Sequence, residues 1–436
     1  MGGGGMARKQ EYTSGFANYF ETEAIEGALP KGKNAPQKPP LGLYAEQLSG
    51  TAFTRPRSQN FRSWLYRIRP SVSQGKFSHL PMKLFSSPPF DQNEPSSPNQ
   101  MRWDPLPIPQ ENLDFIDGCI TWLGIGSPHS FAGGAIHLYA CTKPMGNRFF
   151  YNCDAELLVV PQEGPLSIIT EMGSLELDPG FIACLPRGLK FQINPTKKHA
   201  SGYLLENFGQ AFQLPELGPI GANGLANPRD FEYPNAEYFD STGDFQILCK
   251  YQGNMWLSYQ NHHPLDVVAW HGNYAPYRYD LRLFNTIGSI SYDHPDPSIF
   301  TVLTSQTDSP GIANIDFVIF PQRWMVAEDT FRPPYYHRNI MSEYMGLIYG
   351  CYDAKPGGFI PGGGSLHNCM SPHGPDREAF INATTADLKP EHYQNTLAFM
   401  FESKQVWQPT KFALETHLLQ KNYLDCWSEL PKNFKN

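Results

Sequence analysis

The sequence predicts a mainly β protein with few helices, on three observations. Glycine and proline together number 78 of 436 residues, at 38 and 40 respectively, and both favour turns over helices. Aromatic residues make up 14% of the chain, and strands are enriched in them. Short apolar or alternating runs of four to eight residues, separated by turn signals, indicate a β-sandwich or barrel.

The N-terminal part divides into an arm and a first β region. Residues 1–40 are polar and rich in Gly, Pro and Lys, which predicts an arm or a peripheral hairpin. Within them, Met1 to Gly5 look like a cloning remnant ahead of a natural start at Met6. Residues 41–280 are expected to form an N-terminal β-sandwich domain. Its first strand is the alternating run 62–68, and the Pro-, Ser- and Asn-rich segment 79–110 is expected to be a surface loop.

Further strands of this region follow from apolar runs bounded by turn residues. A long glycine-rich segment, 218–231, is too rich in Gly and Pro for a regular element and is expected to be an ordered loop. The turn signal Asp178-Pro179-Gly180 precedes one of the runs. The predicted strands are 135–140, 156–160, 181–184, 202–206 and 267–274.

Residues 281–436 are expected to form a second β-rich domain. The predicted strands are 299–303, 316–320 and 397–401, and the clearest helix candidate lies near 411–426. Sequence periodicity does not decide whether the two β-rich halves arose by duplication.

Composition excludes several classes of protein. The formal net charge is −8, and the chain has no basic patch, so nucleic acid is not an expected partner. No run approaches the roughly 18 apolar residues that a membrane span needs. Eight cysteines form no CxxC pair, and the N-terminus has no export pattern. We therefore expect reduced thiols and a cytoplasmic location.

A histidine and a glutamate six residues apart, His337 and Glu343, suggest a metal site. On a strand, side chains six residues apart share a face, whereas on a helix they are roughly 240° apart. Pro333 and Pro334 disfavour a helix entering from the N-terminal side. We therefore expect a strand that points both side chains into one interior.

A glycine-rich turn at 361–364 leads to two more histidines, His367 and His373. Either one could complete a site with His337 and Glu343. Two histidines and one carboxylate form the facial ligand set of non-haem iron(II) oxygenases, which leaves three adjacent octahedral positions open. A single histidine on a strand is more often a hydrogen-bonded core residue, but a buried glutamate without a cation is costly.

A further histidine, His294, precedes two prolines at positions 295 and 297, which suits a rigid loop at the mouth of a site. Its ordinary pKa makes it a natural general base. A turn histidine that caps backbone groups would have the same sequence. Polar donors available to a substrate are Tyr335, Tyr336, Tyr352 and His367.

At these residues the sequence closely resembles the homogentisate 1,2-dioxygenase family. The resemblance runs from about residue 12 to the last strands, and several stretches match over eight or more residues in order. The most specific stretches are 43–50, 218–231, 267–274, 331–339 and 371–376. The segment 79–96 and the extra N-terminal residues depart from the family pattern without touching the expected ligands.

The resemblance implies a role for each candidate. It implies iron(II) bound by His337, Glu343 and His373, with His294 as the general base. It implies Tyr352 beside the substrate and His367 in the pocket without binding the metal. His373 and Tyr335 are also expected on the substrate side.

The resemblance also implies a fold, an assembly and a reaction. The fold is a cupin-like (RmlC-like) β-sandwich or jelly roll, and the assembly is a homohexamer built as a dimer of trimers. The reaction opens the ring of homogentisate with O2 to give 4-maleylacetoacetate, in the breakdown of phenylalanine and tyrosine. Two alternatives use the same residues: a zinc- or manganese-dependent cupin isomerase, and a non-catalytic cupin binding protein.

Overall fold

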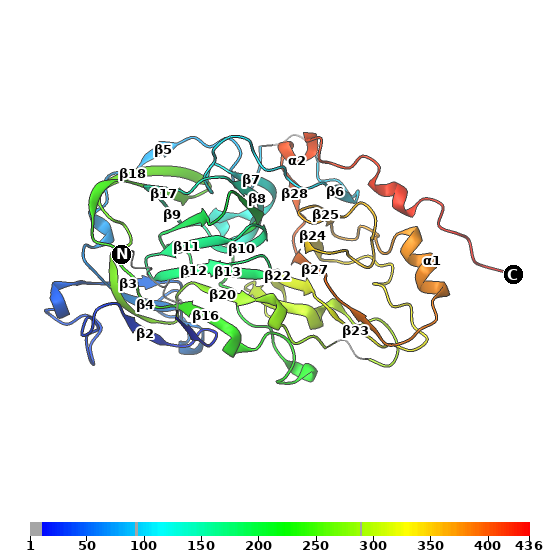
Figure 1. The fold of residues 1–436 in the computed structure, drawn as a ribbon, viewed down its shortest axis with the longest axis horizontal. Helices are drawn as coiled ribbons and strands as arrows, with labels where there is room; N and C mark the ends of the chain where they lie inside the picture. The colour runs from blue at the N-terminus through cyan, green and yellow to red at the C-terminus, as the bar shows by residue number, and fades with distance from the viewer. Residues whose placement is uncertain (1–10, 92–94, 288–289) are drawn as a thin grey trace, which may run out of the picture.

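The protein, analysed as a computed structural model, is built almost entirely of antiparallel sheets (Figure 1). The structure describes residues 11–91, 95–287 and 290–436, so the expected cloning remnant at 1–5 lies outside the described residues. The predicted mainly β class is confirmed. No helix in the described ranges is long and apolar enough to cross a membrane.

The two largest sheets belong to the N-terminal half of the chain. The nine-stranded sheet has the order β1 (Tyr12–Ser14), β16 (Phe231–Pro234), β20 (Tyr277–Asp280), β13 (Phe181–Leu185), β10 (Glu156–Glu163), β15 (Ala200–Asn207), β8 (Ala132–Cys141), β7 (Cys119–Ser127) and β28 (Gln408–Pro409). The seven-stranded sheet has the order β12 (Gly173–Leu177), β11 (Leu166–Thr170), β14 (Phe191–Pro195), β9 (Arg148–Asn152), β17 (Thr242–Tyr251), β18 (Asn254–His262) and β5 (Ser78–Leu80).

Three smaller sheets complete the fold. One contains β2 (Phe20–Glu23), β19 (Val267–Gly272), β4 (Arg62–Arg67) and β3 (Tyr44–Ser49). The C-terminal six-stranded sheet contains β21 (Thr301–Gln306), β22 (Ala313–Phe320), β27 (Leu397–Ser403), β24 (Ser342–Tyr349), β25 (Gly364–His367) and β6 (Met101–Trp103). The last pairs β23 (Arg323–Met325) with β26 (Glu391–Tyr393).

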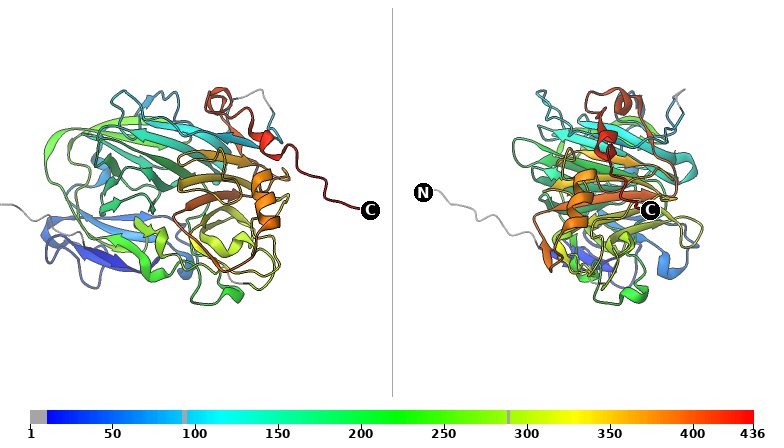
Figure 2. Two further views of the ribbon diagram at one scale, coloured as in Figure 1. Left: turned by 45° about the vertical axis from the view of Figure 1, so that its right-hand side comes forward. Right: turned by 90° about the vertical axis from the view of Figure 1, so that its right-hand side faces the viewer.

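The middle of strand β10, from Leu157 to Pro161, is continuously apolar because both of its faces are covered. Leu157 and Val159 enter the core between the nine- and seven-stranded sheets, together with Ile168 and Phe191. Leu158 and Val160 belong to a second core that also contains residues of the six-stranded sheet. A strand that is covered on both faces needs apolar residues at every position. The nine-stranded sheet is therefore a middle layer, and Figure 2 shows the C-terminal sheet against it.

Two strands cross between the halves of the chain. β6, from the segment predicted as a surface loop, forms the edge of the C-terminal sheet beside β25. β28, from the C-terminal region, pairs with β7 at the edge of the nine-stranded sheet. The division into domains at 280/281 stays a prediction, and the strands at this division are interleaved. β1 and β2, from the segment predicted as an arm or hairpin, pair with β16 and β19 in two different sheets.

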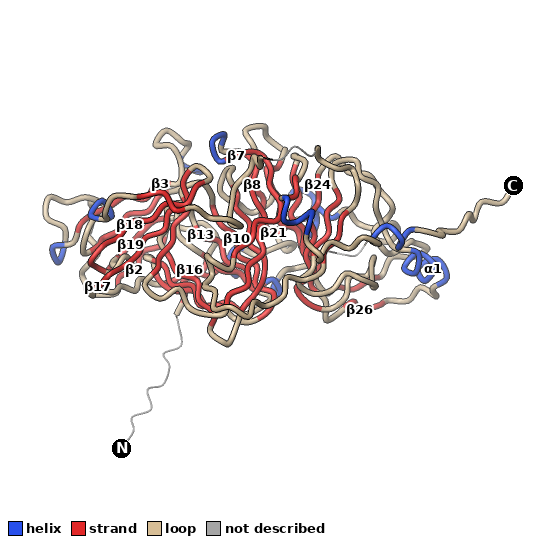
Figure 3. The backbone as a smooth tube through the Cα atoms, turned by 90° about the horizontal axis from the view of Figure 1, so that it is seen from above, coloured by secondary structure: helices blue, strands red, loops and turns tan. Residues whose placement is uncertain are grey.

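The helices differ from the prediction. The expected helix at 411–426 is short: α2 ends at Glu415 (Lys411–Glu415), and a 3₁₀ turn, η9 (Tyr423–Trp427), follows later. The helix α1 (Arg377–Thr385) was not predicted. It begins at Asp376, whose side chain accepts a hydrogen bond from Ala379 N–H, a capping signal that the sequence did contain. In Figure 3, α1 lies with the loops at the C-terminal end of the molecule.

Candidate metal centre

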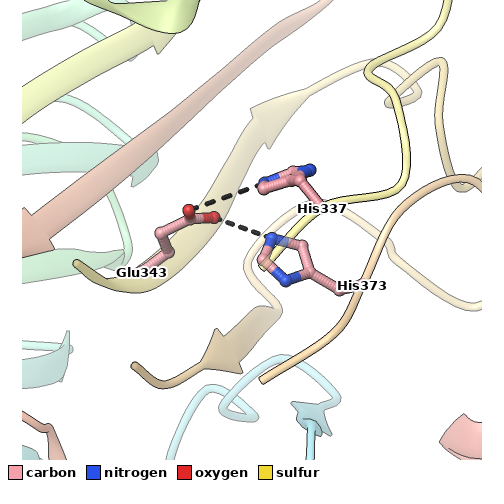
Figure 4. Close-up of side chains that lie close together, drawn as sticks. All are labelled: His337, Glu343 and His373. Atoms are coloured by element: carbon pink, nitrogen blue, oxygen red, sulfur yellow. Dashed lines mark hydrogen bonds and ion pairs between the residues drawn. The ribbon is translucent and has the colours of Figure 1, made fainter. Parts of the chain in front are cut away.

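Three side chains with metal-ligand chemistry meet beside the C-terminal sheet. The ligand atoms of His337, Glu343 and His373 all lie within 4.8 Å of one another. His373 Nε2 is 3.0 Å from Glu343 Oε2, and His337 Nε2 is 3.7 Å from Glu343 Oε1 (Figure 4). Glu343 and His373 are buried, while the His337 side chain is 28% exposed. The cluster is thus open on one side only.

The chain brings His337 to this site by a different route from the predicted one. The expectation that one strand carries both His337 and Glu343 is wrong, because β24 begins only at Ser342. His337 lies in the preceding loop and pairs with His373 in an isolated antiparallel bridge. His337 N–H donates to the His373 carbonyl at 3.0 Å, and His373 N–H donates back at 3.1 Å. This two-bond exchange fixes the spacing of the two rings, which a continuous strand would otherwise have set.

A glycine next to His373 makes this pairing possible. A Cβ atom at Gly374 would lie 2.5 Å from the Tyr336 ring and 3.0 Å from the Tyr336 Cα. A substitution there would push apart the two segments that carry the histidines. A glycine is therefore required at position 374 by the close approach of the two loops.

The two histidines are oriented in the same way. His337 Nδ1–H donates to the Tyr335 carbonyl at 2.7 Å, and His373 Nδ1–H donates to the Ser371 carbonyl at 2.9 Å. A carbonyl only accepts, so the hydrogen is on Nδ1 in both rings. In the neutral imidazole each Nε2 then has a free lone pair, which is the orientation of a metal-binding histidine. Both lone pairs lie beside the same carboxylate, an arrangement that calls for a cation between them.

The carboxylate is held in its charged form. Without a metal, a protonated imidazole can donate its Nε2–H to Glu343, and a bound metal would replace that proton. Burial alone would raise the pKa of Glu343, but these hydrogen bonds from His337 and His373, with one from Asn339, lower it below its ordinary value. The bond to Glu343 in turn raises the pKa of His337, against its partial burial. With neutral imidazoles the three ligands carry one negative charge, so a divalent ion would leave the centre with one net positive charge. Such a centre favours an anionic oxygen as a further ligand.

The residue that holds the Glu343 carboxylate in place, Asn339, was not predicted from the sequence. Asn339 Nδ2 donates to Glu343 Oε1 at 2.9 Å and to Glu402 Oε1 at 2.7 Å. Burial and the nearby charge of Glu343 raise the pKa of Glu402 to about 7. The position of Asn339, between the two predicted ligands His337 and Glu343, was the available signal. A residue that hydrogen-bonds to a metal ligand in this way orients the ligand and tunes its basicity.

A cavity of about 310 Å³ opens onto the three ligands. Its size suits a ligand with a single aromatic ring. His294, Tyr335, Tyr352 and His367 also line it, whereas Tyr336, the remaining candidate donor, lines a separate pocket. Oxygen and nitrogen donors converge in a space that is otherwise bounded by Phe, Met and Pro side chains.

His294 lies at the mouth of this cavity. Its ring meets the Tyr335 ring edge to face, with 6.0 Å between centroids. Burial lowers the pKa of His294; Asp353 opposes this shift and Arg323 adds to it. The imidazole is therefore neutral near pH 7 and able to accept a proton.

The two candidate tyrosines differ in exposure. Tyr352 is buried, and its ring contacts Phe320 and Phe359 at centroid distances of 5.7 and 6.2 Å. Tyr335 is 43% exposed, and its hydroxyl donates to Asp296 at 2.7 Å. The backbone of Tyr335 also accepts the hydrogen bond from His337 Nδ1, so this residue supports a ligand as well as lining the cavity.

His367 is a neighbour of the ligands and not one of the three. Its ring stacks on the His373 ring with 4.1 Å between centroids and 8° between planes. Its Nε2 lies 3.2 Å from Lys355 Nζ and 2.8 Å from the Tyr423 hydroxyl. Burial lowers the pKa of Lys355 to about 7, and the positive charge of Arg102 adds to this shift. Lys355 and Tyr423 were not predicted, because neither stands in a motif and Tyr423 is remote in sequence.

The mainly β fold carries a centre of two histidines and one carboxylate, the ligand set that metal-dependent oxygenases of the non-haem type use. Two family models cover the chain: "Homogentisate 1,2-dioxygenase N-terminal" matches residues 11–281, and "Homogentisate 1,2-dioxygenase C-terminal" matches residues 282–434. The chain belongs to the homogentisate 1,2-dioxygenase family. It is an enzyme that opens the aromatic ring of homogentisate with O2, which sets aside the isomerase and binding-protein alternatives.

Solved structures with distant similarity include two enzymes. A salicylate 1,2-dioxygenase mutant from Pseudoaminobacter salicylatoxidans is 8% identical, covers 65% of this chain and 76% of its own, and has a TM-score of 0.27. Bacillus subtilis oxalate decarboxylase is 15% identical, covers 79% of this chain and 90% of its own, and has a TM-score of 0.28. At TM-scores this low, neither likeness supports a statement about this chain.

Proposed function

We propose that the metal is iron(II), held by His337 Nε2, His373 Nε2 and Glu343. The observation that carries this proposal is the pair of imidazole lone pairs facing one buried carboxylate. A facial set of this type leaves room for O2 and a substrate oxygen together, whereas zinc more often takes a tetrahedral site with one open position. Bound iron(II) would supply the electron transfer from the ring to O2 and the acidity that favours a phenolate ligand.

His294 is proposed as the base that removes the phenolic proton. A free phenol has a pKa of about 10 and is a poor anionic ligand at neutral pH. A neutral imidazole at the mouth of the cavity can accept that proton. Asp353, which opposes the effect of burial on the pKa of His294, would stabilise the imidazolium that forms.

The remaining residues would bind the substrate and exclude water. Tyr352 is buried against Phe320 and Phe359, and this apolar wall would shield the reacting ring. His367 and Lys355 add polar atoms deeper in the same cavity. Tyr335 stands at its edge, fixed by the bond to Asp296.

The test of the metal is reconstitution. The protein is stripped of metal under anaerobic conditions and given Fe(II), Zn(II) or Mn(II) separately. Only Fe(II) should restore O2 uptake, with one O2 consumed for each homogentisate and growth of the product absorbance. Equal turnover with Zn(II), or product formation without O2, would refute the proposal.

The test of the base is His294→Ala. This variant should keep its iron and lose roughly 10²–10⁴-fold in rate, the usual worth of a general base. Metal content and steady-state rate are measured on the same preparation. A normal rate would remove His294 from the proposal and leave the ligands untouched.

We further infer that the product is 4-maleylacetoacetate, within phenylalanine and tyrosine breakdown, that the enzyme is cytoplasmic, and that it forms a hexamer from two trimers. The family membership supports these statements. Sedimentation of the purified protein would test the assembly, since a monomer of 49.2 kDa and a hexamer differ sixfold in mass.

A further inference from the structure

The 3₁₀ turn η9 (Tyr423–Trp427) lies behind the metal centre, although it is 50 residues beyond His373 in the sequence. Trp427 Nε1–H donates to the carbonyls of Gly374 and Pro375, at 3.2 and 3.0 Å, directly after His373. The Tyr423 ring packs against Trp427 at 5.1 Å and lies under the Arg102 guanidinium at 4.3 Å. This turn therefore contacts the loop that carries His373.

The hydroxyl of Tyr423 joins a buried group of three polar atoms. It lies 2.6 Å from Lys355 Nζ and 2.8 Å from His367 Nε2, and Lys355 Nζ lies 3.2 Å from His367 Nε2. All three residues are at most 3% exposed, so solvent does not compete for these bonds.

Counting hydrogens determines which of these atoms accept. In its charged form Lys355 only donates, and the Tyr423 oxygen, at 2.6 Å, is the nearer of its two acceptors. The hydrogen of Tyr423 then has His367 Nε2 within bonding distance as its acceptor. A neutral imidazole that accepts at Nε2 carries its hydrogen on Nδ1.

The Nδ1–H group of His367 has no hydrogen-bond acceptor among the described residues. Within the described part of the chain, His367 Nδ1 is a buried polar atom without a hydrogen-bond partner. The ring lines the substrate cavity and is held parallel to the ring of His373. Buried donors are rarely left without acceptors, so an acceptor is expected from whatever fills the cavity.

We propose that Tyr423 is a positioning residue of the active site: its hydroxyl fixes the tautomer of His367, so that Nδ1–H is presented to an oxygen of the hydroxyaromatic substrate. This inference rests on the proposed function and assigns to η9 a part in it. Tyr423 acts through His367 and does not itself touch the substrate.

The decisive variant is Tyr423→Phe, which removes one hydroxyl and keeps the ring between Arg102 and Trp427. Without that donor, only the longer contact from Lys355 Nζ, at 3.2 Å, remains at His367 Nε2, so the Nε2–H tautomer should become more populated. Iron content should stay at the wild-type level, while the dissociation constant of homogentisate, measured without O2, should rise by about tenfold, the effect of one buried hydrogen bond. The rate at saturation should change less than the affinity.

A spectroscopic readout separates positioning from general destabilisation. In metal-free protein with nitrogen-15 histidine, at pH 6, the His367 resonances should report Nδ1–H in the wild type. They should shift toward Nε2–H in Tyr423→Phe. Replacing Tyr423 with 4-aminophenylalanine, which restores a donor, should return both the tautomer and the affinity, and it decides the question if the Phe variant does not fold.

The matched control is Tyr233→Phe. Tyr233 is equally buried, and its hydroxyl accepts a hydrogen bond from Ala17 N–H in the N-terminal half. This control should lower stability without moving the His367 signals or the substrate affinity. Unchanged signals and affinity in Tyr423→Phe overturn the inference while wild-type turnover stands. A wild type that shows no iron-dependent O2 uptake overturns the proposed function itself.

Discussion

In the part of the chain that the structure describes, two buried clusters pair histidine with glutamate, one in each half, and the C-terminal one borders a cavity. In the N-terminal half, Glu206 accepts from Lys250 Nζ at 2.5 Å and lies 3.1 Å from His137 Nε2. In the C-terminal half, Glu343 faces two imidazoles, while the nearby Lys355 bonds to Tyr423 and His367. Glu206 and His137 are fully buried, whereas His337 reaches a cavity.

The difference lies in the source of the positive charge. Burial would raise the pKa of Glu206, but Lys250 and His137 lower it to about 2. Lys250 therefore acts as a built-in cation, and Asn152 Nδ2 saturates the second carboxylate oxygen at 2.6 Å. In the C-terminal cluster Lys355 bonds to Tyr423 and His367 rather than to the carboxylate, so two imidazole Nε2 atoms are left to face Glu343. The same residue types thus form an internal ion pair in one sheet and a metal centre beside the other.

The largest expected effect comes from breaking the C-terminal cluster. Glu343→Ala, His337→Ala or His373→Ala should each lose bound metal, and activity should fall with it by roughly 10³-fold or more. Metal analysis and O2 uptake on the same sample measure both losses. Retention of full metal content by any of these variants would contradict the assigned ligand set. Lys250→Met is the matched control and should leave the metal content of the folded protein unchanged.

Breaking the N-terminal cluster should instead cost stability. Lys250→Met leaves the Glu206 charge buried without its cation, which typically lowers the free energy of unfolding by about 3–5 kcal/mol. Urea denaturation of the metal-free protein measures the change. The double variant Lys250→Met with Glu206→Gln should recover part of the loss, because it removes the stranded charge. A single variant as stable as the wild type would show that Lys250 is not the compensating cation.

A milder change sharpens the comparison at the carboxylate. Asn339→Ala removes the donor shared by Glu343 and Glu402 and should weaken metal binding by about 10–100-fold, the range for second partners of ligands. Competition with a chelator measures the affinity. The corresponding change Asn152→Ala beside Glu206 should leave that affinity unaltered, and an equal effect from both would point to a global loss of structure.

The smallest effect concerns pH. A carboxyl whose pKa is lowered on folding contributes stability that is fully present above its unfolded pKa and is lost as pH falls toward the folded value. For Glu206 this window runs from its ordinary 4.5 down to about 2. The slope from one such group is at most about 1.4 kcal/mol per pH unit. In the metal-free protein, Glu206→Gln should weaken the dependence of the free energy of unfolding on pH in the acid range. An unchanged dependence would show that Glu206 is not ionised.

The sequence predicted which residues form the site better than it predicted the secondary structure that holds them. Most apolar runs became strands, because alternation and turn residues act locally. The prediction that one strand carries both His337 and Glu343 was wrong, because a long-range bridge to His373 holds His337 instead. Lys355 and Tyr423 were missed because no spacing rule links them to His367, whereas Asn339 was missed although its partner Glu343 is only four residues away.

The strand exchange between the halves has a consequence for how this chain can be divided. A cut near residue 281 would leave the C-terminal sheet without β6, so that β25, which ends at His367, would present unsatisfied backbone groups. The same cut would take β28 away from β7. Neither fragment would be a self-contained module, because the sheet beside the metal ligands is completed by β6, at residues 101–103, more than 200 residues before His337.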